Sequence, residues 1–128
     1  DIIDGDAGND ILTGGEGEDI FVWDKSDVGT SGSPAVDEVT DFEEGNDVLD
    51  LSDLLSDELA DGSPAYSIEG LSAGVDPSDQ HLQLSITDES TDTVVQVIDL
   101  TNVAVGPGDD ANDMVNNLLD NGSIEDGL

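Results

Sequence analysis

The segment Gly14-Gly15-Glu16-Gly17-Glu18-Asp19-Ile20-Phe21-Val22 decides the fold expected for this chain. It has glycine at positions 1, 2 and 4, aspartate at position 6 and a large apolar residue at position 8. Residues 5–13 repeat this pattern with Asp6 in place of the second glycine, and residues 1–4 match the end of an earlier copy. Copies in one register are typical of a stacked repeat rather than of a glycine-rich linker. The acidic and apolar positions are Asp1, Asp10 and Asp19, and Ile3, Leu12 and Phe21.

Each nine-residue repeat predicts a six-residue turn followed by a three-residue strand. The glycines permit backbone angles that residues with a Cβ rarely adopt, and the middle side chain of the strand points inward. Two repeats complete one coil, so repeats n and n+2 stack at the strand spacing of about 4.8 Å. The repeats therefore predict a short parallel β-roll.

The same stacking brings like charges together, because it places Asp1 beside Asp19. Two carboxylates roughly 5 Å apart repel each other by about 3 kcal/mol at an effective dielectric constant near 20. A divalent cation between them turns this repulsion into an attraction, and Ca²⁺ prefers six to eight oxygen ligands such as carboxylates and turned-in carbonyls. We therefore expect Ca²⁺ in the glycine turns. The spacing of an EF-hand loop does not occur in the sequence.

The composition of the chain also favours bound cations. The 128 residues hold one Lys or Arg against 33 acidic residues, which gives a net charge of −32. This charge argues against nucleic acid and against direct binding to an anionic membrane. The chain has no Cys, so bound metal is the alternative staple for a secreted domain. We expect a fold that depends on cations.

The rest of the chain shows weaker local signals. Trp23 is expected to cap the apolar end of the roll, and His81 is expected to be a surface residue. The clearest pattern is a β-hairpin formed by residues 81–87 and 94–100. The other predicted elements are strands at 36–42, 48–51 and, weakly, 66–68, and helices at 52–60 and 110–120.

Residues 1–23, together with the pattern Asp-x-(apolar)-x-Asp-Phe-x-x-Gly-x-Asp-x-(apolar)-Asp-Leu-Ser at 37–52, resemble the C-terminal end of RTX (repeats-in-toxin) proteins. This pattern is similar both in serralysin-type proteases and in large RTX adhesins. The leucine-rich segment, the hairpin and residues 115–122 resemble more closely the type I secretion target domain of giant adhesins.

The resemblance implies a mainly β fold. Its parts are a calcium-bound parallel β-roll stub at residues 1–23 and a β-sandwich-like cap with one or two short helices at residues 24–128. The second part would carry an uncleaved C-terminal secretion signal. Because Asp1 falls in the middle of a repeat, we also expect further repeats upstream.

The resemblance also implies the metal ligands, which are backbone carbonyls of the turns and the position-6 aspartates of stacked repeats. One site takes Asp1, Gly14, Glu16 and Asp19. A second begins with Asp6, Gly8 and Asp10, and a third with Gly15, Gly17 and Asp19. Asp27 and Asp37 are the candidates that close the last two sites. Asp6 departs from the glycine pattern, which puts the turn angle of its repeat in question.

The function that follows is a non-catalytic calcium-dependent module. In low calcium it stays unfolded and passes, C-terminus first, through an ABC transporter of a type I secretion system. Outside the cell it folds on calcium and nucleates or caps the upstream part of a large secreted adhesin at the bacterial surface. As a fragment it is expected to be a monomer.

Three alternatives remain. The chain can be the C-terminal region of a secreted protease or lipase whose catalytic domain lies upstream. It can itself be an enzyme, although the single His has no nucleophile motif beside it and Cys is absent. It can bind ice through the roll, but the outward positions Ala7, Asn9, Glu16 and Glu18 form no array of Thr or Asn.

Overall fold

The structure is a computed structural model that describes residues 2–4, 8–24, 28–29, 32–43, 45–56, 59–74, 80–106 and 109–125. Its fold is mainly β, as expected, with two sheets and two short helices in the described part of the chain. The first sheet has the order β1 (Ile2–Asp4), β3 (Ile20–Val22), β5 (Val48–Asp50) and β9 (Ile124–Glu125). The second has the order β2 (Ile11–Leu12), β4 (Ala35–Val39), β8 (Thr93–Ala104), β7 (His81–Asp88) and β6 (Tyr66–Ala73).

The register of the first two stacked coils is the one that the repeats predict. Strand β1 pairs in parallel with β3, Ile2 opposite Ile20 and Ile3 opposite Phe21. The paired residues are eighteen positions apart, which equals two nine-residue repeats. Two repeats therefore form one coil, and the strands alternate between the two sheets.

Inward apolar side chains form one ladder on each sheet. Their registers follow from the parallel pairings. Most of these residues are almost fully buried and belong to a single core cluster that both sheets share, so burial of apolar surface fixes the register of the roll. The two ladders are Ile3, Phe21, Leu49 and Ile124, and Leu12, Val39 and Leu100.

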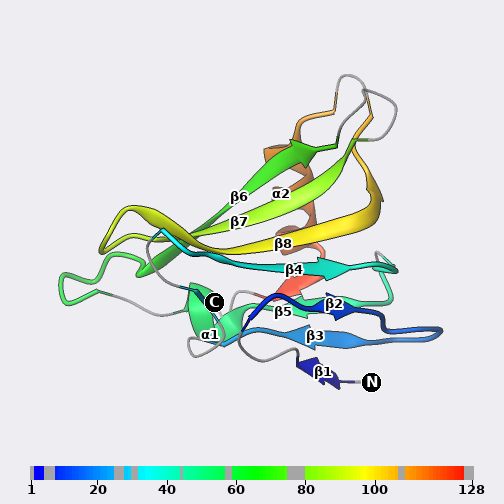
Figure 1. Ribbon diagram of the computed structural model, residues 1–128, viewed down its shortest axis with the longest axis horizontal. Helices are drawn as coiled ribbons and strands as arrows, with labels where there is room; N and C mark the ends of the chain where they lie inside the picture. The colour runs from blue at the N-terminus through cyan, green and yellow to red at the C-terminus, as the bar shows by residue number, and fades with distance from the viewer. Residues whose placement is uncertain are drawn as a thin grey trace.

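Both sheets of the roll continue beyond the glycine repeats (Figure 1). Strand β4 stacks on β2 and strand β5 stacks on β3, each in parallel. Further along, β8 stacks on β4 and β9 on β5. The two parts expected at residues 1–23 and 24–128 thus contribute strands to the same two sheets, and the boundary at residue 23 stays a prediction.

The predicted hairpin and C-terminal helix are present. Strands β7 and β8 pair antiparallel around residues 89–92, and β6 adds an outer strand longer than the weak signal at 66–68. Helix α2 (Ala111–Asp120) starts at the N-cap Asp110, whose carboxylate accepts the amides of Asn112 and Asp113. Helix α1 (Ser52–Leu55) is shorter than the predicted 52–60, and residues 57–58 lie outside the described residues. Trp23 is buried in the core cluster that both sheets share, and its expected role as a cap of the apolar end of the roll stays a prediction.

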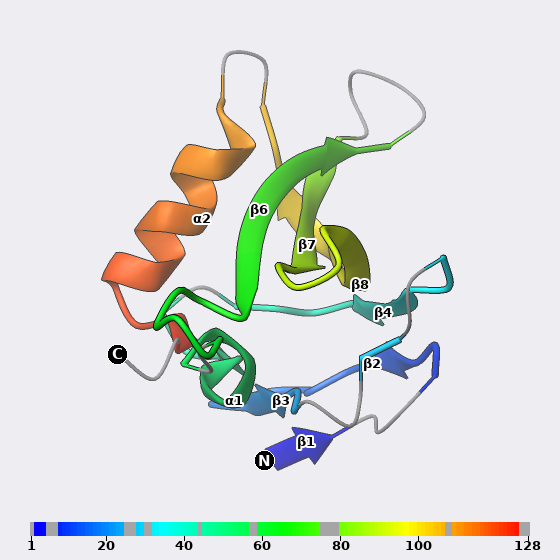
Figure 2. The same ribbon diagram turned by 90° about the vertical axis from the view of Figure 1, so that its left-hand side faces the viewer.

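Helix α2 lies against the outer strand β6 (Figure 2). A Cβ atom on Gly70 would lie 2.3 Å from the carbonyl oxygen of Ala111, so only glycine permits this approach. The amide of Gly70 donates a 2.8 Å hydrogen bond to Oδ1 of Asn112. Because β6 is the last strand of its sheet, this bond occupies a donor that an open edge would otherwise expose.

The substitution Gly70→Ala is expected to displace α2 and to lower the free energy of unfolding by about 1–3 kcal/mol, the usual cost of overpacking. Urea unfolding at fixed calcium concentration measures it. Asn112→Ala removes only the hydrogen bond and should cost about 1 kcal/mol, and Glu69→Ala on the same strand is the control because its side chain is exposed. Equal stability of the Gly70 and Glu69 variants would contradict this account of the contact.

Candidate metal centre

The glycine turn before β3 has the geometry that its sequence predicts. Gly15 and Gly17 have φ angles of +85° and +95°, in the region that L side chains rarely adopt. Gly14 is required for a different reason, because a Cβ at this position would lie 2.5 Å from Oδ2 of Asp19. The buried carboxylate of Asp19 is therefore folded over the turn.

Asp19 stacks on Asp47 of the next coil in the same sheet. The amide of Asp19 donates to Oδ1 of Asp47 at 3.0 Å, and the amide of Val48 donates to the carbonyl oxygen of Asp19 at 2.9 Å. The other oxygen of Asp47, Oδ2, accepts the amide of Glu43 at 2.9 Å. Both aspartates are buried, so two acidic residues of stacked coils are neighbours in register with little solvent around them.

The sequence reasoning did not include Asp47 among the site residues. A signal existed, because Gly45-Asn46-Asp47-Val48-Leu49 has the spacing of the second half of a repeat. Gly45 has φ +91°, close to the +95° of Gly17 at the equivalent position. Residues before β5 thus form a further roll turn that has lost its first two glycines.

A second stacked pair, Asp10 and Asp37, lies on the other sheet. The amide of Asp10 donates to Oδ1 of Asp37 at 2.8 Å, and the amide of Glu38 donates to the carbonyl oxygen of Asp10 at 2.8 Å. Asp37, one of the two residues expected to close a site, therefore lies beside Asp10 in the register of the coils.

The two pairs offer the oxygen chemistry that a hard cation requires. Oδ2 of Asp10 is buried and has no hydrogen-bond partner among the described residues. No Lys or Arg lies in the described part of the chain, because the single one is Lys25. A buried carboxylate oxygen without a donor or cation is costly, so these residues fit Ca²⁺.

The other predicted ligands are distributed as follows. Gly8 has φ +104°, and Glu16 is exposed at the turn. Asp1, Asp6 and Asp27 lie outside the described residues. The described ranges hold no group of three or more His, Cys, Asp or Glu side chains that could bind a metal. Any site here therefore depends on turn carbonyls in addition to paired aspartates.

The carboxylate of Asp41 also links two stacked turns through hydrogen bonds. Oδ1 and Oδ2 of Asp41 accept the amides of Gly14 and Gly15 at 2.9 and 2.7 Å. Successive amides that converge on one anion are a recognised anion-binding arrangement of turns. The sequence reasoning did not single out Asp41, whose role follows only from the register of the coils.

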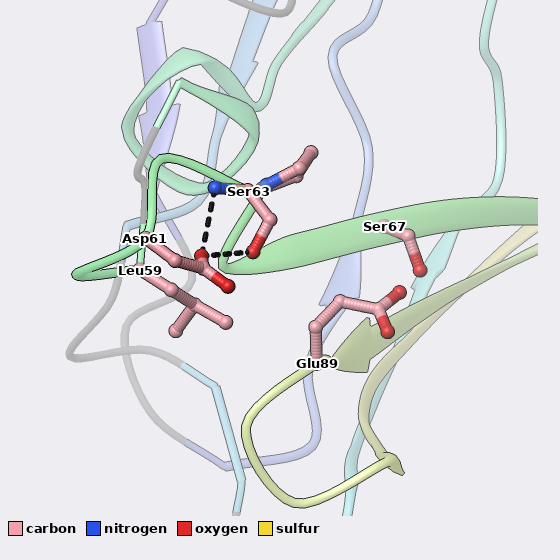
Figure 3. A pocket seen from close by; sticks show the side chains of 6 residues that line it. Leu59, Asp61, Ser63, Ser67 and Glu89 are labelled. Atoms are coloured by element: carbon pink, nitrogen blue, oxygen red, sulfur yellow. Dashed lines mark hydrogen bonds between the residues drawn. The ribbon is translucent and has the colours of Figure 1, made fainter.

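A separate hollow of about 420 Å³ lies away from the glycine turns (Figure 3). The hydroxyl and the amide of Ser63 donate to Asp61 there, and these bonds lower the pKa of the Asp61 carboxyl below its usual value. The single His of the chain, His81, does not belong to this lining. Its Nε2 lies 3.2 Å from Oδ1 of Asp99. The lining is Leu59, Asp61, Ser63, Pro64, Ser67 and Glu89 and contains no His or Cys.

The parallel coils, glycine turns and stacked aspartates define an RTX-type β-roll module, as the repeats predict. The family model described as Peptidase M10 serralysin C terminal matches residues 2–115. The chain therefore belongs to this family. The family match does not test the narrower resemblance to giant adhesins, which stays a prediction.

Two solved structures share the fold. Both are subunits of the mannuronan C5-epimerase AlgE6 from Azotobacter vinelandii. The R2 subunit is 22% identical with a TM-score of 0.58, over 99% of this chain and 71% of that one. The R3 subunit is 22% identical with a TM-score of 0.51, over 81% and 59%. A comparison with curated protein sequences gave no match. No helix in the described residues is long and apolar enough to cross a membrane.

The substitution Gly45→Ala is expected to lower the free energy of unfolding by about 1–2 kcal/mol, because alanine is strained in the left-handed region. The space around this position is open, so the loss arises from backbone strain and not from a clash. Gly45→Asn is the matched control and should lose less, because Asn tolerates this region. Chemical unfolding of both variants tests this, and equal losses would contradict a left-handed turn here.

Proposed function

We propose that the chain is a non-catalytic calcium-binding module that folds when Ca²⁺ occupies the oxygen-lined spaces between stacked turns. The observation that carries this proposal is the stacking of two aspartate pairs, Asp10 with Asp37 and Asp19 with Asp47, in a chain of net charge −32. Asp19, Asp37 and Asp47 are buried, and Asp10 is half-buried with its Oδ2 atom buried. Family membership supports it, since RTX-type modules bind calcium.

The proposed ligands combine turn carbonyls with these aspartates. The expected carbonyl and aspartate sets are retained, and the two open sites are closed by residues that the register places beside them. Asp47, which was not among the candidates, is proposed as the partner of Asp19. Asp37 is proposed as the partner of Asp10, because its Oδ1 accepts one hydrogen bond and retains a second lone pair. The sets are Asp1, Gly14, Glu16 and Asp19; Asp6, Gly8, Asp10 and Asp37; and Gly15, Gly17, Asp19 and Asp47.

The magnitudes support a switch. At a free calcium concentration about 10 times Kd, one site stabilises the folded state by about 1.4 kcal/mol, and three such sites by about 4 kcal/mol. This is close to the lower end of the whole stability of a small domain, about 5–15 kcal/mol. Extracellular calcium modules have Kd values of about 10⁻⁴–10⁻³ M, so the contribution vanishes at cytosolic calcium and self-repulsion then favours the expanded chain.

We further propose that the chain is exported by a type I secretion system and folds after leaving the ABC transporter. Membership of the serralysin C-terminal family supports secretion. The C-terminal part would carry the export signal, as the resemblance to secretion target domains suggests. The family match favours a secreted protease as the parent at least as much as an adhesin at the cell surface.

A capping role toward an upstream roll has support from the open end of the sheets. Strands β1 and β2 are the outermost strands of the two sheets on the same side of the roll. Ile2 on β1 is 76% exposed, whereas Ile20, which has a neighbour on each side, is 37% exposed. A further coil stacked on β1 would cover Ile2 in the same way. We propose that this end nucleates upstream repeats.

The folding switch predicts that far-ultraviolet circular dichroism shows strand structure in millimolar calcium and a largely unfolded chain in EDTA. In a calcium titration, Asp47→Asn should raise the midpoint concentration roughly tenfold, the effect of losing about 1.4 kcal/mol of interaction. Glu69→Gln is the control, because it removes the same charge from an exposed position. The same spectrum and melting temperature with and without calcium would exclude the switch.

The export proposal predicts that a cargo fused ahead of residues 1–128 appears in the medium of cells with a type I transporter. Deletion of residues 111–128, which removes α2 and β9, should abolish export. A deletion of residues 1–23 is the control and should leave export intact. Export that survives the C-terminal deletion would place the signal elsewhere.

A further inference from the structure

The carboxylate of Asp37 bonds to more than the stacked turn. It is 1% exposed. Its Oδ1 accepts the amide of Asp10 at 2.8 Å, and its Oδ2 accepts both Nε1 of Trp23 at 2.7 Å and Nε2 of Gln96 at 2.9 Å. Three charge-assisted hydrogen bonds therefore stabilise one buried anion.

The three donors come from separate parts of the roll. Asp10 precedes β2, Trp23 directly follows β3 of the first sheet, and Gln96 lies on β8 of the second sheet. They are 27, 14 and 59 residues from Asp37 in sequence. The side chain of Asp37 thus links the glycine turn at Asp10 to Trp23, next to the first sheet, and to Gln96, within the second sheet.

Gln96 supports a specific role for this contact. It is fully buried, and its Oε1 has no hydrogen-bond partner among the described residues. Its Nε2 donates to Asp37 and to the carbonyl oxygen of Val97. A buried acceptor without a donor is costly, and an apolar side chain would avoid this cost, so the donor to Asp37 is the feature that requires glutamine here.

We infer that Asp37 is a positioning residue that couples the calcium-bound turn at Asp10 to the docking of strand β8 on β4. The inference rests on the proposed function. When the turn is ordered by Ca²⁺, the Asp10 amide holds Oδ1 of Asp37, and this orients Oδ2 toward Trp23 and Gln96. Without the ion, the two carboxylates repel each other, and the indole and the amide lose a correctly placed acceptor.

Coupling of this kind is reciprocal. A docked β8 fixes Asp37 through Gln96 and thereby favours calcium binding next to Asp10. A residue that is only a calcium ligand behaves differently, because its loss weakens folding of the whole chain at one common midpoint. Loss of a coupling residue instead separates the midpoints of the two regions that it joins.

Hydrogen–deuterium exchange with mass spectrometry across a calcium titration separates these cases. In the unaltered chain, peptides from residues 8–23 and from residues 81–104 should gain protection at one calcium concentration. In Asp37→Asn the two midpoints should differ by about tenfold or more, which corresponds to one lost buried hydrogen bond to a charge. The amide has one acceptor oxygen and cannot satisfy all three donors.

Matched variants keep the test decisive. Asp61→Asn removes the same charge and hydrogen bonds to Ser63 at the surface, and its midpoints should stay coincident. If Asp37→Asn does not fold, Gln96→Met and Trp23→Phe, which each remove one donor and keep Asp37, should show the separation in smaller form.

The outcomes distinguish the two proposals. If the unaltered chain gains no protection with calcium, the proposed function fails and this inference fails with it. If the unaltered chain responds to calcium but the midpoints of the Asp37 variant, or of both donor variants, stay coincident, only the coupling role is overturned.

Discussion

The stacking of Asp10 on Asp37 and of Asp19 on Asp47 is the constraint on which the rest of the roll depends. Phe21 must lie on Leu49 and Leu12 on Val39 for the core to close, and each aspartate lies two residues before its apolar partner. The register that aligns the core therefore aligns like charges. A slip by one residue would separate the carboxylates, but it would turn the apolar side chains outward. The sheets cannot relieve this repulsion by themselves.

Hydrogen bonds offset part of the repulsion and leave the charge in place. Amides donate to Asp37, Asp41 and Asp47, and each bond to a charged acceptor contributes about 1.5–3 kcal/mol. This is similar to the repulsion of about 3 kcal/mol within one pair. The bonds can therefore fix each carboxylate in its orientation, but a net charge of −32 still opposes the compact state. A bound cation reduces both the repulsion within a pair and the net charge of the chain, because it neutralises charge where two coils meet.

The sequence was sufficient to predict the local structure wherever the repeat pattern or the hydrophobic periodicity was intact. It predicted the register of Ile3 on Phe21, the hairpin of β7 and β8, and the helix α2. It did not reveal Asp47, because its turn retains only Gly45 of the three repeat glycines. It also could not predict that β8 and β9 join the roll, since parallel pairing with strands about 60 and 75 residues earlier leaves no periodic signal. Gln96 owes its role to that long-range register, and Asp41 owes its role to the stacking of β4 on β2.

The position of β9 bears on the proposed export direction. Leu49 donates to the carbonyl oxygen of Ser123 and Leu51 to that of Glu125, and Ile124 completes the apolar ladder of its sheet. A chain that leaves the transporter C-terminus first exposes β9 and β8 before their partners β5 and β4 are outside. The parallel pairings of β8 with β4 and of β9 with β5 cannot form until residues 35–50 have emerged, so completion of the roll depends on non-local pairing and is slow relative to local helix formation. On this proposal, calcium acts on the module only when its stacked turns are outside the transporter, so folding of the module follows the emergence of its N-terminal coils.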